Sequence, residues 1–142
     1  MFVLVIGAGR VGSAVARKAL ADGHTVSVLD EDPLSHERLD AGLVTSWEES
    51  GGRFTVGQGI EIDALKEAGI EEADVFIAST DGDNTNLVIA QIAQKGFDIP
   101  HVMVRVMDPA RAAWYSEQGL RTISPTQVAI SEFEAALSEV AG

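Results

Sequence analysis

The sequence contains no cysteine, which excludes disulfides, thiolate metal sites and cysteine nucleophiles together. Basic residues are scarce as well, with 10 Lys and Arg against 22 Asp and Glu and a net charge of −12. This balance argues against nucleic acid and an anionic membrane surface as partners. No apolar run approaches the roughly 18 residues that cross a bilayer, and the first residues lack the basic region of a signal peptide. We expect a cytoplasmic protein without lipid insertion.

The alternation of apolar runs and helical patterns predicts one α/β domain of 142 residues. The expected strands are 2–6, 25–29, 53–56, 74–79, 101–106 and 121–123. The expected helices are 10–21, 34–41, 62–68, 86–95, 110–118 and 125–140. This alternation predicts a Rossmann-like, doubly wound parallel sheet of six strands in the order 3-2-1-4-5-6. Helix caps are expected at Asp108 and Ser124, each followed by proline, and at Asp83 or Asn84.

Two segments are harder to interpret. Residues 42–52 have no clear period and predict a loop or insertion, with Trp47 exposed beside two glutamates. The last helix carries Ile130, Phe133, Leu137 and Val140 on one face. Together with Trp114 and Tyr115, that face is either a dimer surface or part of the core, and the sequence leaves both alternatives open.

The first strand leads into Gly7-Ala8-Gly9-Arg10-Val11-Gly12, the context that a dinucleotide-binding turn requires. In such a turn Gly7 permits the bend, Gly9 lets a pyrophosphate approach the backbone, and Gly12 lets the helix pack on the strand. The amides and dipole at the start of the helix attract phosphate. The alternative is a tight turn without a ligand.

Asp30 closes the second strand, where an acidic residue hydrogen-bonds the hydroxyls of the adenosine ribose. A carboxylate there repels a 2′-phosphate, which favours NAD or an adenine mononucleotide over NADP. The alternative is a turn aspartate within the segment Asp30-Glu31-Asp32-Pro33.

Other polar residues are expected at the same edge of the sheet. Arg10 and Arg105 could neutralise phosphate, with ion pairs to the abundant carboxylates as the alternative. Three residues follow the fourth strand, across the switch-point crevice from the glycine turn: Thr80, Asp81 and Asn84. Their alternative role is helix capping.

Catalytic groups are hard to find. His24 and His101 begin strands, on the edge away from the ligand, and His36 belongs to a short helix. Tyr115, the one tyrosine, lacks the following lysine of a reductase pair, and no P-loop, nucleophile elbow or HExxH motif is present. We therefore expect no catalytic residue, no metal site and no enzyme. The rival hypotheses are a small NAD-dependent oxidoreductase, or the cofactor-binding domain of one, and an interaction module with a vestigial site.

Four blocks together resemble the regulator-of-potassium-conductance N-terminal (RCK-N or KTN) domain of Trk- and Ktr-type potassium uptake regulators. They are MFVLVIGAGRVG, VLDEDP, DALKEAGIEEADVFIASTDGDNTNL and VRVMDPARAAWYSEQGLRTISPT. The resemblance covers nearly the whole chain, so residues 1–142 are expected to form one such domain, with the last helix as a crossover or dimerisation helix.

The resemblance implies a cytoplasmic regulatory subunit of a potassium uptake system. Such domains bind NAD(H), ATP, ADP or AMP, form dimers or rings, and gate a membrane potassium channel or transporter. By position, the implied ligand contacts are Gly7, Gly9, Arg10, Val11 and Gly12 to phosphates, Asp30 and Glu31 to the ribose, Gly57, Gln58 and Gly59 beside the adenine, and Ser79, Thr80, Asp81, Asn84 and Arg105 toward the phosphate or distal end.

This sequence departs from the family pattern in three ways. Gln58 replaces the usual aspartate, which leaves the base preference open. Residues 42–52 form a longer segment than the family norm. The chain ends at Gly142 without the C-terminal ligand-binding domain of many relatives, so it is either a stand-alone subunit or a piece of a longer protein.

Overall fold

Six parallel strands form the centre of the computed structural model, which describes residues 1–142. The strands are β1 (Phe2–Ile6), β2 (Thr25–Asp30), β3 (Arg53–Val56), β4 (Val75–Ala78), β5 (His101–Arg105) and β6 (Arg121–Ile123). They lie in the order β3-β2-β1-β4-β5-β6, which confirms the predicted doubly wound topology. The chain crosses from one half of the sheet to the other between β3 and β4.

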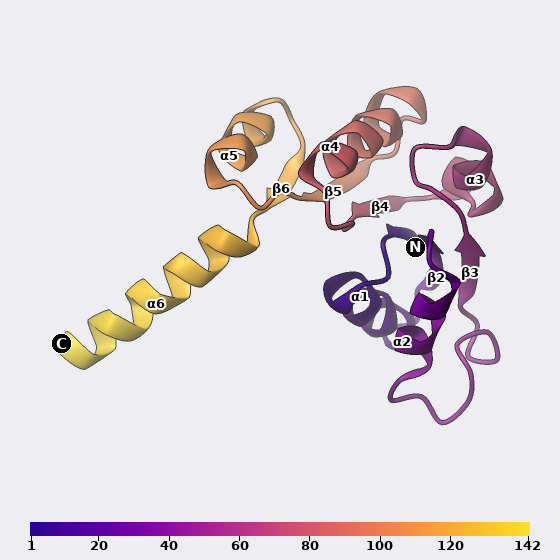
Figure 1. Ribbon diagram of the computed structural model, residues 1–142, viewed down its shortest axis with the longest axis horizontal. Coiled ribbons are helices and arrows are strands. Elements are labelled where there is room, and N and C mark those ends of the chain that lie inside the picture. The colour runs from indigo at the N-terminus through magenta and orange to yellow at the C-terminus, as the bar shows by residue number, and fades with distance from the viewer.

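Helices cover both faces of the sheet (Figure 1). On one face lie α1 (Arg10–Ala21) and α2 (His36–Asp40), and on the other lie α3 (Ile62–Glu67), α4 (Asp83–Gln91) and α5 (Pro109–Glu117). Short helical turns are η1 (Pro33–Ser35), η2 (Ile70–Glu72) and the π-helical η3 (Ile92–Gly96). The predicted helix 34–41 is thus η1 followed by α2, and the predicted helix 86–95 begins earlier and ends in η3.

Two buried clusters hold these layers together. The larger cluster includes Leu4, Ile6 and Phe76, and the smaller one includes Val3 and Val5. Successive side chains of a strand point to opposite faces of the sheet. An apolar run such as β1 therefore supplies both clusters, as expected for a strand covered by helices on both sides.

Helix starts were predicted in part. The carboxylate of Asp108 accepts from the amide of Ala110 at 3.1 Å, and the Ser124 hydroxyl accepts from the amide of Gln127 at 3.2 Å. The prediction that Asp83 or Asn84 caps α4 is wrong, because Gly82 is the N-cap and makes no side-chain bond. Asp83 instead accepts from the amide of Met107 at 2.9 Å and so ties α4 to the loop after β5.

The segment 42–52 contains no helix or strand, as predicted, but Trp47 is not exposed. Its side chain is fully buried in the smaller cluster, and its indole N–H donates to the Arg53 carbonyl at 3.0 Å. Its backbone amide donates to the carboxylate of Asp40 at 2.8 Å. The buried indole therefore holds this loop against the smaller cluster, on the side of the sheet covered by α1 and α2, although its neighbours in the sequence are polar.

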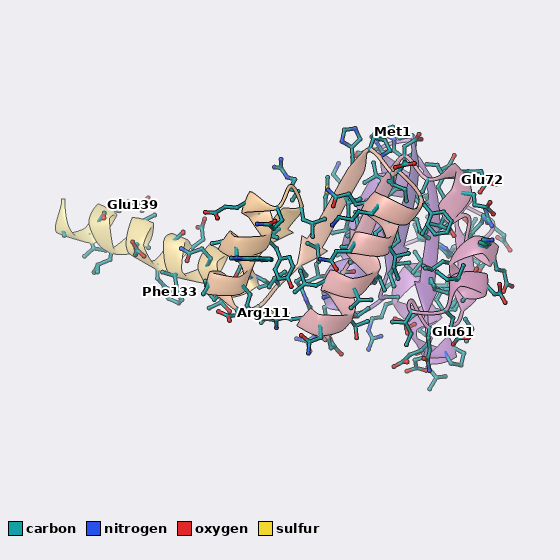
Figure 2. The ribbon with its side chains drawn as sticks, turned by 90° about the horizontal axis from the view of Figure 1, so that it is seen from above. Met1, Glu61, Glu72, Arg111, Phe133 and Glu139 are labelled. Carbon is teal, nitrogen blue, oxygen red and sulfur yellow. The ribbon has the colours of Figure 1, made fainter.

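The last helix, α6 (Pro125–Ala141), projects away from the sheet and buries none of its residues (Figures 1 and 2). Phe133 is 78% exposed and Val140 is 87% exposed, so the apolar face of α6 is not part of the core. Trp114 is also exposed, whereas Tyr115 packs partly against the larger cluster. None of the helices is both long and apolar enough to cross a membrane.

Candidate functional site

A cleft of about 480 Å³ opens at the edge of the sheet where the strands end. Glu61 and Arg111 mark this edge in Figure 2, and Met1 marks the opposite edge, where the strands begin. The cleft lies between the turn after β1, the end of β2, the turn at residues 57–60 and the turn after β4. Its volume is within the range of small-molecule sites, and its place is the switch point at which doubly wound sheets bind ligands.

The three glycines of the first turn serve different purposes. Gly7 has a φ of +98°, and a Cβ there would lie 2.7 Å from the Ser79 carbonyl oxygen. A Cβ on Gly12 would lie 1.8 Å from the Gly7 carbonyl oxygen, so close packing of α1 on β1 requires glycine. A Cβ on Gly9 would meet no atom within 4 Å. The fold therefore accounts for Gly7 and Gly12, whereas Gly9 borders open space.

That open space lies in front of the N-terminus of α1. The helix begins at Arg10 with Gly9 as its N-cap, no side chain caps it, and its first turn contains no acidic residue. The first amides of a helix have no partner within the helix, and its dipole leaves a partial positive charge at this end. The turn therefore offers an anion a set of oriented N–H donors.

Asp30 ties the glycine turn to the end of β2. One carboxylate oxygen accepts from the amide of Ala8 at 2.6 Å, and the other accepts from the amide of Asp32 at 2.8 Å. The guanidinium of Arg38 approaches the same turn and donates to the Ala8 carbonyl at 3.3 Å. Since each carboxylate oxygen has two lone pairs, Asp30 can still accept from a hydroxyl in the cleft.

Two further glycines border the cleft at residues 57–59. A Cβ on Gly57 would lie 2.9 Å from the Ala64 Cβ, and one on Gly59 would lie 2.7 Å from the Ile6 side chain. Both positions therefore require glycine for packing. Gln58, between them, also lines the cleft.

The opposite rim is built around Asn86, which is 1% exposed. Its side-chain oxygen accepts from the amide of Thr80 at 2.9 Å and from the Thr80 hydroxyl at 2.6 Å. Its side-chain nitrogen donates to the carbonyls of Thr80 and Arg105, both at 3.0 Å. Asn86 thus joins the ends of β4 and β5. Sequence reasoning missed it, although an amide on the buried face of an amphipathic helix was the available signal.

Arg105 belongs to the same rim. Its guanidinium donates to the Thr80 carbonyl and lies 3.5 Å from the carboxylate of Asp81, and 18% of its side chain is exposed. Its Nε atom is buried without a hydrogen-bond partner. Asn84 accepts from the guanidinium of Arg111 at 2.7 Å. These side chains therefore make contacts within the protein.

Ten of the residues expected to contact a ligand line the cleft: Gly7, Gly9, Asp30, Glu31, Gly57, Gln58, Gly59, Ser79, Thr80 and Asp81. Five do not line it: Arg10, Val11, Gly12, Asn84 and Arg105. The lining also includes residues that the sequence did not suggest, among them Ser35, Arg38, Ile60 and Thr85. No histidine, lysine or tyrosine is among them, and His24 contacts the N-terminal amino group at the opposite edge of the sheet.

Residues 3–125 match the TrkA-N domain family. The chain belongs to this family. It is 42% identical over 124 residues to the Trk system potassium uptake protein TrkA of Streptomyces coelicolor, covering 87% of this chain and 52% of that protein. It is 33% identical over 135 residues to a TrkA homolog of Methanothermobacter thermautotrophicus, covering 94% of this chain and 59% of that protein. This TrkA-N chain thus spans little more than half the length of these relatives.

Solved structures support the same fold. The C-terminal domain of Kef from Shewanella denitrificans, in an AMP-bound form, has a TM-score of 0.77 at 23% identity, covering 100% of this chain and 83% of that one. GsuK bound to ADP has a TM-score of 0.77 at 18% identity, and the match covers 98% of this chain and 34% of that one. A GsuK channel bound to NAD has a TM-score of 0.66 at 16% identity, and the match covers 87% of this chain and 21% of that one.

Proposed function

We propose that this TrkA-N chain senses an adenine nucleotide in the cleft and thereby regulates a membrane potassium transporter. The observation that carries the proposal is the open space at Gly9, in front of the uncapped start of α1. The relatives are named as potassium uptake proteins, which supports a role in potassium transport. The AMP, ADP and NAD bound to structural neighbours support the ligand class.

The phosphates bind at the glycine turn. Gly7 and Gly12 shape this turn, Gly9 leaves the approach open, and the first amides of α1, including that of Val11, donate hydrogen bonds. Arg10 is exposed at the start of this helix and supplies a mobile positive charge for a terminal phosphate. In a chain with a net charge of −12, such local donors are what an anionic ligand needs.

The adenosine lies toward β2 and the turn at residues 57–59. Asp30 and Glu31 accept hydrogen bonds from the ribose hydroxyls, and Gly57, Gln58 and Gly59 border the base. Asp32 adds a further carboxylate to this end of the cleft, which repels a 2′-phosphate. The proposed ligands are therefore NAD(H), ATP, ADP or AMP, and not NADP.

On the opposite rim, the cleft-lining residues Ser79, Thr80 and Asp81 face the distal part of the ligand. Arg105 and Asn84 act indirectly, because their side chains hold Thr80, Asp81 and the start of α5.

The proposed partners are a membrane potassium transporter subunit, at the cytoplasmic face of the membrane, and a second copy of this chain. The exposed face of α6, with Phe133, Leu137 and Val140, supports a homodimer or a larger ring. Such an exposed apolar stripe is typical of an interaction surface. A nucleotide shifts the assembly only through different affinities for its conformational states.

An oxidoreductase is the rival function, and the lining of the cleft disfavours it. A hydride-transfer enzyme needs a general acid or base next to its substrate, and the lining holds carboxylates but no lysine, no tyrosine and no histidine, the side chain that most often has that role. We propose that the chain has no catalytic residue. Turnover of NADH with a carbonyl substrate, lost on replacing Thr80 or Asp81, would favour the rival.

Calorimetric titration with NADH, NAD, ATP, ADP, AMP and NADPH tests the proposal. At least one of the first five is expected to bind, and NADPH is expected to bind much more weakly. Gly9→Ala should abolish binding, because its methyl group enters the space proposed for phosphate, while Gly96→Ala on η3 serves as the matched control. Absence of binding by every nucleotide, or unchanged stabilisation of Gly9→Ala by nucleotide, would contradict the proposal.

A further inference from the structure

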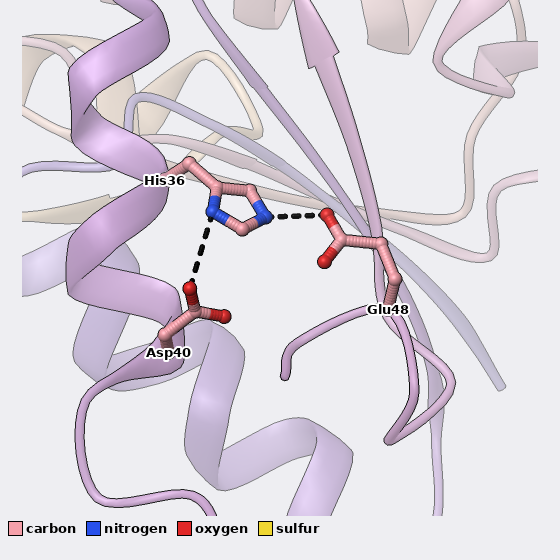
Figure 3. A group of neighbouring side chains, drawn as sticks. All are labelled: His36, Asp40 and Glu48. Carbon is pink, nitrogen blue, oxygen red and sulfur yellow. Dashed lines mark hydrogen bonds and ion pairs between the residues drawn. The ribbon is translucent and has the colours of Figure 1, made fainter. Parts of the chain in front are cut away.

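Outside the cleft, the side chains of His36, Asp40 and Glu48 lie together (Figure 3). One atom from each, a ring nitrogen of His36 and a carboxylate oxygen of each acid, lies within 4.8 Å of the other two. His36 and Asp40 are four residues apart on α2, so they share one face of that helix. Glu48 arrives from the loop at residues 42–52.

The fold holds these three residues in place. The buried Trp47 precedes Glu48 and anchors the loop, and its backbone amide donates to Asp40 at 2.8 Å. The His36 ring packs edge-on against Phe54 of β3, with the ring centres 5.2 Å apart. The loop, the helix and the strand are therefore fixed relative to one another at this point.

The imidazole of His36 has a carboxylate at each of its nitrogens. Nδ1 lies 3.4 Å from the carboxylate of Asp40, and Nε2 contacts the carboxylate of Glu48. A neutral imidazole carries one N–H and can satisfy only one of two carboxylates. Asp40 and Glu48 form no ion pair with a lysine or arginine, so a protonated His36, which would donate to both, is the one cationic group of the chain with which a metal ion competes there.

The donor set fits a divalent transition metal. Imidazole nitrogen and carboxylate oxygen are ordinary zinc ligands at about 2.0–2.2 Å, and two such ligands on a tetrahedral ion lie about 3.3–3.6 Å apart. The separation of 3.4 Å between His36 Nδ1 and Asp40 matches that spacing. One ion binds only one nitrogen of a ring, so an ion held by His36 Nδ1 and Asp40 gains Glu48 as a ligand when that carboxylate turns away from Nε2. The Glu48 side chain is half exposed and has room for this turn, and water can complete the coordination.

We propose that His36, Asp40 and Glu48 bind one divalent transition-metal ion, such as Zn²⁺. The sequence suggested no metal site, because the ligands follow no familiar spacing and meet only through the fold of the 42–52 loop. The ion joins this loop to α2. Since Ser35 and Arg38 of the same segment line the cleft, the ion also stiffens one wall of the nucleotide site.

Calorimetric titration of Zn²⁺ into metal-stripped protein tests this assignment. One ion per chain is expected, together with a rise in melting temperature that EDTA reverses. His36→Gln, Asp40→Asn and Glu48→Gln should each weaken binding at least tenfold. Asn at position 40 retains an acceptor for the amide of Trp47, so this variant is expected to fold, as circular dichroism would verify.

The matched controls are His24→Gln and His101→Gln, which remove the other two histidines of the chain, both located at the opposite edge of the sheet. They should retain the full affinity for Zn²⁺. Cobalt provides a second measurement, since Co²⁺ bound at the site would give visible absorption bands that vanish in His36→Gln. The site would be refuted by lack of Zn²⁺ binding to the unmodified chain, by unchanged affinity in any of the three ligand variants, or by equal loss in a control.

Discussion

The two strand–helix turns that face each other across the cleft are built on opposite principles. The turn from β1 into α1 has no side-chain cap, and Gly9 borders open space. The turn from β4 into α4 is closed on itself, because the buried Asn86 bonds to the backbone of Thr80 and Arg105. The first turn leaves its backbone N–H groups available to an anion, whereas the amide of Thr80 in the second turn is already bonded within the protein. The same edge of the sheet thus combines an open turn with a rigid one.

Replacing Gly12 should have the largest effect, because a side chain there collides with the backbone of Gly7. Gly12→Val is expected to lose more than about 4 kcal/mol of unfolding free energy, or to fail to fold. Gly9→Ala in the same turn should lose less than about 1 kcal/mol, since only the N-cap preference of α1 changes. Urea denaturation of both variants measures the contrast, and similar losses in the two would contradict the distinct roles of these glycines.

Removing the centre of the closed turn should come next. Asn86→Leu leaves the Thr80 amide and the Arg105 carbonyl without their partner, which is expected to cost about 2–5 kcal/mol of unfolding free energy. Asn84→Ala, two residues earlier on the exposed side of α4, should change the free energy of unfolding by less than about 0.5 kcal/mol. Thermal or urea unfolding distinguishes the two variants. An unchanged free energy of unfolding in Asn86→Leu would show that the turn from β4 into α4 does not depend on Asn86.

At the end of the cleft proposed for adenosine, Asp30→Asn should lower nucleotide affinity roughly 10–100-fold, the equivalent of a hydrogen bond to a charged group. Asp74→Asn is the matched control, because Asp74 also accepts a backbone amide, that of Phe2 at 2.7 Å, but lies at the opposite edge of the sheet. Calorimetry should find normal affinity in this control. Equal affinities in the two variants would remove Asp30 from the ribose site.

The smallest effect is expected at Arg10, which is exposed and has no fixed partner. Arg10→Gln should weaken ATP binding about two- to fivefold and AMP binding less, since an exposed charge contributes up to about 1 kcal/mol. Lys18→Gln, farther along α1, should change neither. Titrations at low and high salt measure the difference, and an equal effect on ATP and AMP would place Arg10 away from the terminal phosphate.

The sheet was predictable because its signals are local. Continuous apolar runs such as β1 identify strands covered on both faces, and turns such as Gly7–Gly12 mark where each strand meets its helix. The caps at Asp108 and Ser124 were predictable for the same reason, since proline follows each of them.

The contacts between distant segments were not predictable in this way. Trp47 has polar neighbours in the sequence, yet the fold buries its indole under the sheet, where Arg53 satisfies its N–H. Asn86 stands within a helical pattern that does not reveal its partners on β4 and β5. Likewise, His36 and Glu48 are 12 residues apart and meet only because the intervening loop folds back.

Nuclear magnetic resonance tests the contrast between the two turns most directly, by following the backbone amides of the labelled chain during titration with ADP. If nucleotide binds at the turn from β1 into α1, the largest chemical-shift changes should occur at the amides of Gly9 to Gly12, with smaller changes around Asp30. The amides of Thr80 and Asn86 should move little, because they are already bonded within the protein. Absence of shifts in the glycine turn at saturating nucleotide, or larger shifts around Asn86 than around Gly9, would contradict the account.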